Sequence, residues 1–172
     1  MKFKKQSIIY TQRLSLHAFG SKDKQNMIDI LTNEEVGKTF MVPVFESEEQ
    51  KTALFERYVK LSNSNERFVY GIYLKDNLIG FVNDVCVENG EVEIGYVIHP
   101  NFKGNGYATE AVTVAINEIL DSGYSVVKAG AFEGNLASMR VMQKSGMKKI
   151  EQVDYVEYRG VSHRCVYYAK SK

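Results

Sequence analysis

Hydrophobic residues alternate with polar ones in some segments of the chain and recur every three to four positions in others. Residues 10–19 alternate, with Leu14, Leu16 and Ala18 on one face, which predicts a half-buried strand. A helical period follows over about 22–32. The N-terminal part is therefore expected to form a strand and then a helix.

A second helix is predicted to begin at Ser47. The Ser-x-x-Gln spacing from Ser47 to Gln50 is that of a capping box, which satisfies the first free N–H groups of a helix. Residues 33–46 show neither period, so we expect an irregular loop between the two helices. The apolar residues that the second helix would bury are Leu54, Tyr58 and Leu61.

A block of alternating segments follows, over 67–75, 77–88 and 91–98. Asp76-Asn77 and Asn89-Gly90 separate them, and both pairs suit the positive φ angles of tight hairpin turns. Strands that are joined by two-residue turns must be antiparallel. This block is therefore expected to form an antiparallel sheet.

The period becomes helical again after the third of these strands, up to Gly123, which stands where the residue after a helix belongs. Residues 125–132 predict an apolar strand. A further helix is expected over about 136–145, with Asn135 as its N-cap and Gly146 after its end. The chain closes with predicted strands near 147–157 and 161–169, on either side of Arg159-Gly160.

The composition narrows the class of protein. Its 172 residues fit one hydrophobic core, so we expect a single domain over residues 1–172. With 22 Lys and Arg against 21 Asp and Glu, the net charge of +1 argues against nucleic acid or an anionic membrane as a partner. The sequence has no signal-peptide core and no run of about 18 apolar residues, so we expect a cytoplasmic protein.

The cysteines, Cys86 and Cys165, belong to no CxxC pair and no Cys/His cluster. We therefore expect reduced, buried thiols and no metal site.

The strongest candidate for chemistry is the glycine-rich segment from Lys103 to Ala108, between a predicted strand and a predicted helix. Gly104 and Gly106 let the backbone approach a phosphate, and a helix N-terminus favours an anion. The GxxxxGK[ST] pattern of a P-loop is absent. A dinucleotide-binding GxGxxG is incomplete, because Thr109 replaces its third glycine and hairpin strands precede it. A glycine turn that binds nothing is the remaining alternative.

The segment Lys103-Gly104-Asn105-Gly106-Tyr107-Ala108 resembles the acetyl-CoA pyrophosphate loop of the GNAT N-acetyltransferases, whose pattern is Gln/Arg-x-x-Gly-x-Gly/Ala. Lys103 departs from this pattern but keeps a cationic reach, and Met147 stands in place of the usual Phe. The segments that are similar to the RimJ/RimL-like branch of this family are Glu93-Ile94-Gly95-Tyr96, Ala108-Thr109-Glu110-Ala111, Asn135-Leu-Ala-Ser138 and Lys144-Ser-Gly146-Met147.

The resemblance implies a GNAT-type α+β fold, with a mixed, mostly antiparallel central sheet of about seven strands and about four helices on both faces. It implies acetyl-CoA as co-substrate, with its pyrophosphate on the N–H groups of residues 104–108, helped by Lys103. In the family, the strand matching 94–98 carries a bulge and splays from the strand matching 125–132, so that an N–H near Val97 could polarise the thioester carbonyl. The implied cofactor-binding residues are Val97, Ile98, Lys103, Gly104, Asn105, Gly106, Tyr107, Ala108 and Asn135.

Glu93 is the best-placed candidate for the base that deprotonates an amine acceptor, directly or through a water. A lysine-like amine titrates at about 10.4 and needs such a base. The alternative is an ordinary half-exposed carboxylate, because Glu91 would point to the same face of the strand. His99 is less suited, since its place before Pro100 fixes it at a strand end.

Ser138 is the candidate proton donor to the departing sulfur. Many GNAT enzymes offer a Tyr seven residues after the Asn, but Met142 stands there, whereas the RimJ/RimL-like branch offers Ser at the position of Ser138. A serine near a helix N-terminus can also serve only local hydrogen bonds. Asn135 has two roles open to it, as N-cap alone or also as a contact to cofactor or substrate.

The resemblance places the acceptor against residues 33–46 and 154–162. Their carboxylates could attract a cationic amine or could be ordinary solvated surface. We expect an acetyl-CoA-dependent N-acetyltransferase acting on a primary amine, of a protein N-terminus or a small molecule, by direct attack in a ternary complex. The alternative is a non-catalytic acyl-CoA sensor, and homodimer formation stays open. The carboxylates concerned are those of Glu34, Glu35, Glu46, Asp154 and Glu157.

Overall fold

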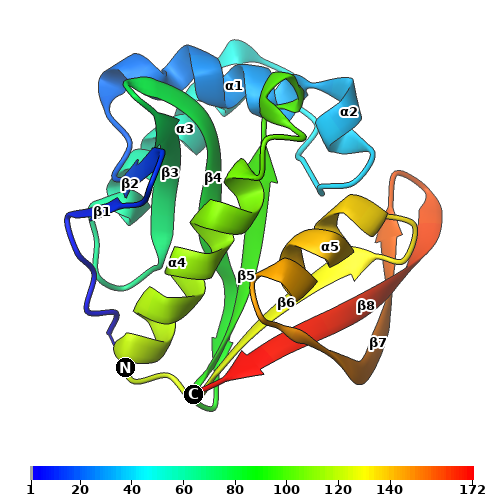
Figure 1. Cartoon of the computed structure of the whole chain (residues 1–172). Coiled ribbons are helices and arrows are strands. Elements are labelled where there is room, and N and C mark those ends of the chain that lie inside the picture. Colours follow the sequence, from blue (N-terminus) through cyan, green and yellow to red (C-terminus); the bar gives the residue numbers. More distant parts are fainter. Residues whose placement is uncertain (1) are drawn as a thin grey trace.

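An eight-stranded sheet, in the order β1-β2-β3-β4-β5-β6-β8-β7, organises residues 2–172, which the computed structural model describes (Figure 1). Every neighbouring pair is antiparallel except β5 and β6, which are parallel. The expected mixed, mostly antiparallel α+β fold is confirmed. The strands are β1 (Ile8–Tyr10), β2 (Leu14–His17), β3 (Val69–Leu74), β4 (Asn77–Glu88), β5 (Glu91–Ile98), β6 (Val126–Phe132), β7 (Lys148–Tyr158) and β8 (Val161–Ser171).

The sheet has one strand more than expected because residues 10–19 form no single strand. Strand β2 lies within them, whereas β1 begins two positions earlier and shares only Tyr10 with them, and the two strands form a hairpin. The chain turns at residues 11–13, where the backbone N–H of Thr11 donates to the carbonyl oxygen of Leu14 and the N–H of Leu14 donates to the hydroxyl oxygen of Thr11, both at 2.9 Å. A hairpin inside an alternating segment leaves little trace in the hydrophobic pattern.

Helices lie on both faces of the sheet (Figure 1). The additional short helix arises in the stretch predicted as a loop, where the Asn33 side chain accepts a hydrogen bond of 2.9 Å from the N–H of Glu35. The helices are α1 (Lys24–Thr32), α2 (Glu34–Gly37), α3 (Glu48–Ser62), α4 (Tyr107–Asp121) and α5 (Leu136–Lys144), and the 3-10 turns are η1 (Ser21–Asp23) and η2 (Pro100–Phe102). None of the helices within residues 2–172 is long and apolar enough to cross a membrane.

Ser47 is the N-cap of α3 as predicted, but the second hydrogen bond of the expected capping box has a different donor. Ser47 accepts from the N–H of Gln50 at 3.3 Å, while the Gln50 side chain accepts from Glu46 rather than from Ser47. Phe55 is the buried apolar residue of this helix. Three residues that were expected to be buried are only partly so, although they pack against a hydrophobic core: Leu54, Tyr58 and Leu61.

The turn between β3 and β4 lies one position earlier than predicted, since Lys75 rather than Asn77 has a positive φ. The other predicted turns hold: Asn89-Gly90 and Arg159-Gly160 have positive φ at both residues. Such turns fix the register of the antiparallel strands that position the site.

The two faces of the sheet carry separate hydrophobic cores. α4 and α5 cover one face, here called the α4 face, where Val92 and Ile94 of β5 pack. α1 and α3 cover part of the other, the α3 face, where Val97 packs. Successive residues of β5 therefore point to opposite faces. Cys165 is buried as expected, but Cys86 is exposed, as are all of residues 85–88 at the end of β4.

Strands β5 and β6 diverge after a short stretch of pairing, as Figure 1 shows. Their pairing ends at Glu93 and Lys128, although β5 continues to Ile98 and β6 to Phe132. We call this unpaired stretch, residues 94–98 facing residues 129–132, the splay. The bulge expected on β5 lies instead on β4, where the register with β5 shifts around Val85. An extra residue bends and twists its strand, so β4 carries β5 away from β6.

Candidate active site

The glycine-rich segment, residues 103–108, lies at the open end of the splay, between β5 and α4. Gly104 and Gly106 have φ angles of +80° and +79°, a backbone conformation that side chains disfavour. Gly106 is the N-cap of α4 and offers no side chain to satisfy the first turn. The free N–H groups of a fifteen-residue helix therefore face outward here, which favours an anion.

Arg13, on the β1–β2 turn, holds this segment in place. Its guanidinium donates to the Asn105 carbonyl oxygen at 2.8 Å and lies 4.6 Å from the centre of the Tyr107 ring. It also pairs with Glu110 in the first turn of α4, at 2.7 Å. The hairpin at one end of the sheet thus preorganises a loop from the middle of the chain.

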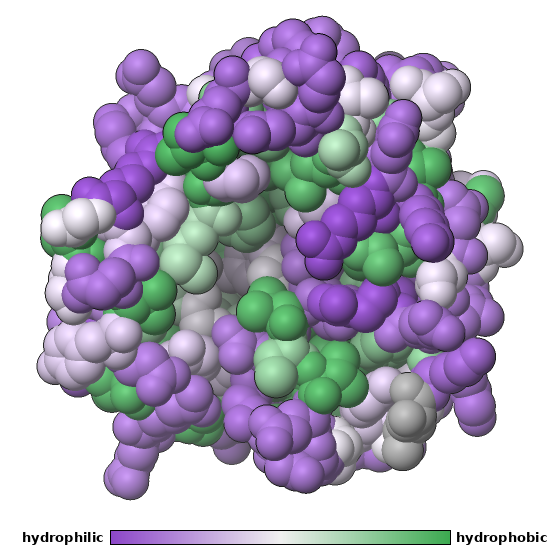
Figure 2. Space-filling model, turned by 180° about the vertical axis from the view of Figure 1, so that it is seen from behind, coloured by the Kyte–Doolittle hydropathy of each residue, from purple (hydrophilic) through white to green (hydrophobic). Residues whose placement is uncertain are grey.

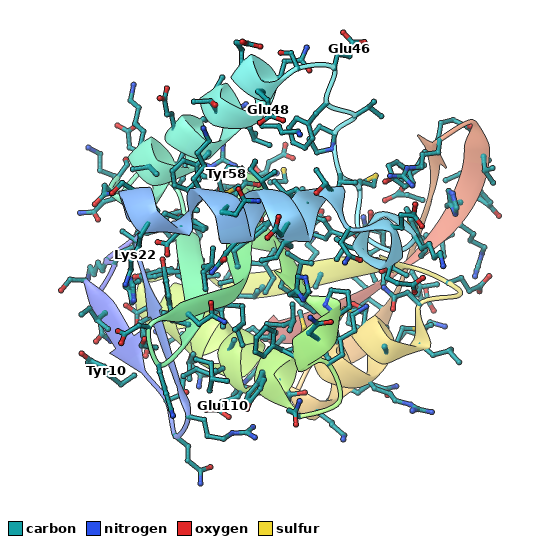
Figure 3. The ribbon with its side chains drawn as sticks, turned by 90° about the horizontal axis from the view of Figure 1, so that it is seen from above. Tyr10, Lys22, Glu46, Glu48, Tyr58 and Glu110 are labelled. Carbon is teal, nitrogen blue, oxygen red and sulfur yellow. The ribbon has the colours of Figure 1, made fainter. Side chains whose placement is uncertain are left out.

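Glu110 completes this anchor on the side of α4 that faces the hairpin (Figure 3). Its carboxylate accepts from the hydroxyl of Thr11 at 2.5 Å and from the backbone N–H of Arg13 at 2.8 Å. Burial alone would raise the pKa of Glu110, but the hydrogen bonds from Thr11 and Arg13 outweigh it and lower the pKa below its ordinary value. Glu110 therefore stays ionised and keeps Arg13 in place.

Among the other predicted loop residues, one side chain can reach a ligand and the rest shape the loop or pack against the core. Lys103 is exposed and free to reach a ligand. Asn105 uses its amide nitrogen to donate to the carbonyl oxygens of Phe102 and Lys103, at 3.2 and 3.1 Å, so its side chain shapes the loop. Tyr107 and Ala108 are half-buried and pack against the α4-face core.

Val97 does not present its N–H to the splay. His99, two positions after Val97, donates its N–H to the carbonyl oxygen of Ile79 on β4 at 2.8 Å. A Cβ on Gly80 of β4 would lie 2.2 Å from the Val97 carbonyl oxygen. Backbone groups alternate along a strand, so Val97 faces β4 while Tyr96 and Ile98 face the splay. The free N–H expected near Val97 would therefore be that of Tyr96 or Ile98.

Ser138 lies in the first turn of α5, on the α4 face. Its N–H donates to the Asn135 side chain at 3.1 Å, which establishes Asn135 as the N-cap. Its hydroxyl lies 2.8 Å from the Tyr96 hydroxyl on β5. Met142, at the place of the usual tyrosine, is fully buried in the core. Asn135 and Ser138 thus lie together at the start of α5, as the spacing predicted, and the Ser138 side chain reaches β5.

Glu93 lies at the closed end of the splay, on the α3 face. Within residues 2–172 it makes no hydrogen bond or ion pair, since its neighbour Lys128 pairs with Glu91 instead. Burial raises the pKa of Glu93 above its ordinary value; Lys128 opposes the shift and Asp154 adds to it. An unpaired carboxylate with a raised pKa is suited to accept a proton near neutral pH.

The α3 face beside Glu93 has further polar groups. Burial raises the pKa of Tyr167 on β8, and its interaction with Asp154 raises it further. Asn83 of β4 lies opposite Gly95, and its buried amide oxygen has no hydrogen-bond partner within residues 2–172. Asn83 also lines a cavity of about 300 Å³ beside α3. Figure 2 shows this face hollowed near its centre, with apolar and pale residues next to the hollow and most of the polar residues farther out.

Tyr158 joins the two segments that were expected to border an acceptor. Its hydroxyl donates to the Gly37 carbonyl oxygen at 3.0 Å and accepts from the Val42 N–H at 3.4 Å. The loop after α2 is thereby held against the β7–β8 hairpin.

The five acidic residues of these two segments do not gather at the site. Asp154 interacts electrostatically with Glu93, whereas Glu35 pairs with Lys38 of its own turn. Glu46 lies at the rim, next to the start of α3 (Figure 3). Glu34, Glu157 and Asp154 are exposed as well, so the interaction with Glu93 is what distinguishes Asp154. Asp154 is therefore the acidic residue of this group that fits the site.

His99 has the structural role expected from its position. Its Nδ1 accepts the N–H of Asn101 at 3.2 Å and so caps η2. The ring packs edge-on against Phe102, 6.2 Å between centroids. This nitrogen is therefore engaged in the turn that leads into the loop.

A family model described as an acetyltransferase (GNAT) domain matches residues 13–148. The chain belongs to the GNAT acetyltransferase family. It is 32% identical over 147 residues to the uncharacterized N-acetyltransferase YnaD of Bacillus subtilis (strain 168), covering 82% of each chain. As a member of this family, it is an acetyltransferase that uses acetyl-CoA.

Solved structures share the fold of this GNAT chain. RimL, a ribosomal L7/L12 α-N-protein acetyltransferase, superimposes with a TM-score of 0.83 over all of both chains at 18% identity. The microcin C7 self-immunity acetyltransferase MccE, in complex with acetyl-CoA and AMP, has a TM-score of 0.81 at 21% identity, over 94% of this chain and 93% of its own. The likeness to RimL is therefore one of fold.

Three features of this GNAT site escaped sequence reasoning. Tyr96 was quoted only as part of a motif, yet it contacts Ser138. Arg13 and Glu110 come from distant segments, and Tyr158 reaches a loop more than one hundred positions away. Each of these contacts joins segments that are far apart in the sequence, so finding it requires knowledge of which strands are neighbours in the sheet.

Proposed function

We propose that the chain transfers the acetyl group of acetyl-CoA to a primary amine by direct attack in a ternary complex. The observation that carries this proposal is the splay, with a carboxylate on one sheet face and a hydroxyl pair on the other. The glycine loop, residues 103–108, lies at its open end. An amine can thus approach from the α3 face while the sulfur leaves on the α4 face.

Residues of the loop and of β5 would hold acetyl-CoA. The free N–H groups at the start of α4 suit the pyrophosphate, and exposed Lys103 adds a positive charge. The backbone groups of Tyr96 and Ile98, which no strand pairs on the β6 side, suit the pantetheine amides and the thioester carbonyl. The unpaired backbone N–H groups of the loop and of β5 thus match the anionic and amide groups of acetyl-CoA.

Glu93 would take the proton that the amine loses. Its raised pKa makes it a stronger base than an ordinary carboxylate. The nearby Asp154 and the unpaired oxygen of Asn83 would attract a cationic amine and accept its hydrogens. These groups support a positively charged acceptor as the substrate class.

Ser138 would supply the proton that the sulfur takes up. It lies on the opposite sheet face from Glu93, so the two proton transfers occur at separate places. Asn135 fixes the backbone of Ser138 by capping α5.

A screen with thiol detection tests the proposed function. Acetyl-CoA is offered with polyamines, aminoglycosides, amino acids and peptides that differ at the N-terminus. We expect thiol release with at least one class, together with an acetylated amine detected by mass spectrometry. Binding of CoA without thiol release across the panel would instead support an acyl-CoA sensor.

Replacing Arg13 with alanine is expected to weaken CoA binding about 3- to 10-fold, because the loop loses its contact to Asn105 and Glu110 loses its countercharge. Isothermal titration with CoA measures the change. Arg164→Ala is the matched control, since Arg164 also pairs with a glutamate, Glu133, away from the loop. Equal loss of affinity in both variants would contradict the anchoring role of Arg13.

A further inference from the structure

A hydrogen bond spans the splay on the α4 face, between Tyr96 of β5 and Ser138 of α5. The two hydroxyl oxygens are 2.8 Å apart, and either of them can be the donor; the Tyr96 hydroxyl can instead donate to the more distant carbonyl oxygen of Ser138, at 3.1 Å. The Tyr96 ring packs against the α4-face core, which restricts its movement. The contact therefore fixes the serine side chain where β5 and β6 no longer pair.

Tyr96 is a neutral donor at physiological pH. Burial raises its pKa to about 12, and the hydrogen bond with Ser138 opposes this shift. No charged side chain contributes to it. A neutral phenol is a better hydrogen-bond donor than an aliphatic alcohol, because it is the stronger acid.

Each hydroxyl of the pair has a single hydrogen. If Tyr96 donates to the Ser138 hydroxyl oxygen, the serine hydrogen must point elsewhere. The Ser138 N–H already donates to Asn135, so the helix start sets the position of its Cβ. A serine held this way has its hydrogen free for a ligand atom beside the splay.

We propose that Tyr96 is a positioning residue that donates to the Ser138 hydroxyl and thereby directs the Ser138 hydrogen to the CoA sulfur. This inference rests on the proposed function and deepens it. During transfer a C–N bond forms, the C–S bond breaks and the sulfur leaves with the electron pair. The sulfur takes the hydrogen of Ser138 and the amine's proton goes to Glu93. Solvent restores the proton on Ser138 and removes the one on Glu93, so thioester and amine become amide and thiol.

The pKa of the CoA thiol, when CoA is bound to the full chain, tests this role directly. Ultraviolet absorbance of the thiolate is followed against pH, with the free protein subtracted. A serine hydrogen directed at sulfur stabilises the thiolate and lowers the thiol pKa. We expect Tyr96→Phe and Ser138→Ala each to raise it by about one unit, a tenfold change, and the double variant to raise it no further than Ser138→Ala.

Tyr70→Phe is the matched control. Tyr70 is also a buried tyrosine of the α4-face core, but its hydroxyl donates to the Gln6 carbonyl oxygen at 2.7 Å, away from the splay. We expect this variant to lose some thermal stability and to keep the wild-type thiol pKa. Melting temperatures of all variants separate loss of fold from loss of positioning.

An unchanged thiol pKa in Tyr96→Phe overturns the inference, as does a shift of the same size in the Ser138→Ala background. The readout uses CoA rather than turnover, so a chain that binds CoA but acetylates no amine still decides the role of Tyr96. That result would overturn the proposed function alone. Failure to bind CoA would overturn both.

Discussion

Replacing Glu93 with glutamine lowers kcat for acetyl transfer by about 10²- to 10³-fold, because the site loses the group that accepts the amine proton. The dependence of kcat on pH should also reveal Glu93 as the proton acceptor. Burial raises the pKa of Glu93, so wild-type kcat falls on the acid side through a pKa above the ordinary carboxylate value. Glu93→Gln loses this limb. Steady-state rates of thiol release against pH measure both effects.

Glu91→Gln is the matched control, since Glu91 lies two positions away on the same strand and pairs with Lys128. It should keep the acid limb and most of the activity. Loss of activity in Glu93→Gln is not expected to come from unfolding of the variant. A raised folded-state pKa contributes stability below the unfolded value, and this is lost as pH rises through the folded value. At neutral pH the glutamine variant should therefore melt no lower than the wild type; a lower melting temperature with parallel loss of activity would refute the catalytic role.

Replacing Gly106 with valine abolishes the stabilisation of the protein by acetyl-CoA. The wild type should gain about 5–10 °C in melting temperature at a concentration one hundredfold above Kd. At Gly106, φ is +79°, and a Cβ would already lie 3.4 Å from the Arg13 guanidinium, so valine strains the loop and occupies the space before the α4 N–H groups. Thermal melting with and without acetyl-CoA measures the effect.

Gly160→Val separates backbone strain from loss of the anion site. Gly160 also has a positive φ, +74°, and nothing lies within 4 Å of an added Cβ. Both variants should lose intrinsic stability, but Gly160→Val should keep the acetyl-CoA shift. A full shift in Gly106→Val would mean that the cofactor phosphates bind elsewhere.

The features that the sequence predicted well are those that neighbouring residues determine. Gly104 and Gly106 lie at a helix start as expected, and both have a positive φ. Asn135 caps α5 as its polar side chain before an amphipathic segment indicated. In each case the interaction is completed within a few positions of the residue itself, so the linear pattern contains it.

The features that the sequence did not predict depend on which strands become neighbours. The Tyr96 contact with Ser138 requires β5 to lie beside the α5 segment, 42 positions later. The position of the bulge, at Val85 and not on β5, depends on the register of two strands. The direction of the Val97 N–H follows from that register as well. Hydrophobic alternation gives the face of a side chain but not the direction of its backbone groups.

The anchor between Arg13 and Glu110 has a consequence for biosynthesis. The two residues are 97 positions apart, so the phosphate loop acquires its fixed shape only after both have emerged and folded together. A nascent chain that has been synthesised only as far as α3 contains the β1–β2 hairpin but not Glu110, the residue that Arg13 pairs with. Cofactor affinity is therefore a late event in folding, and CoA added during refolding should speed none of the steps before α4 docks.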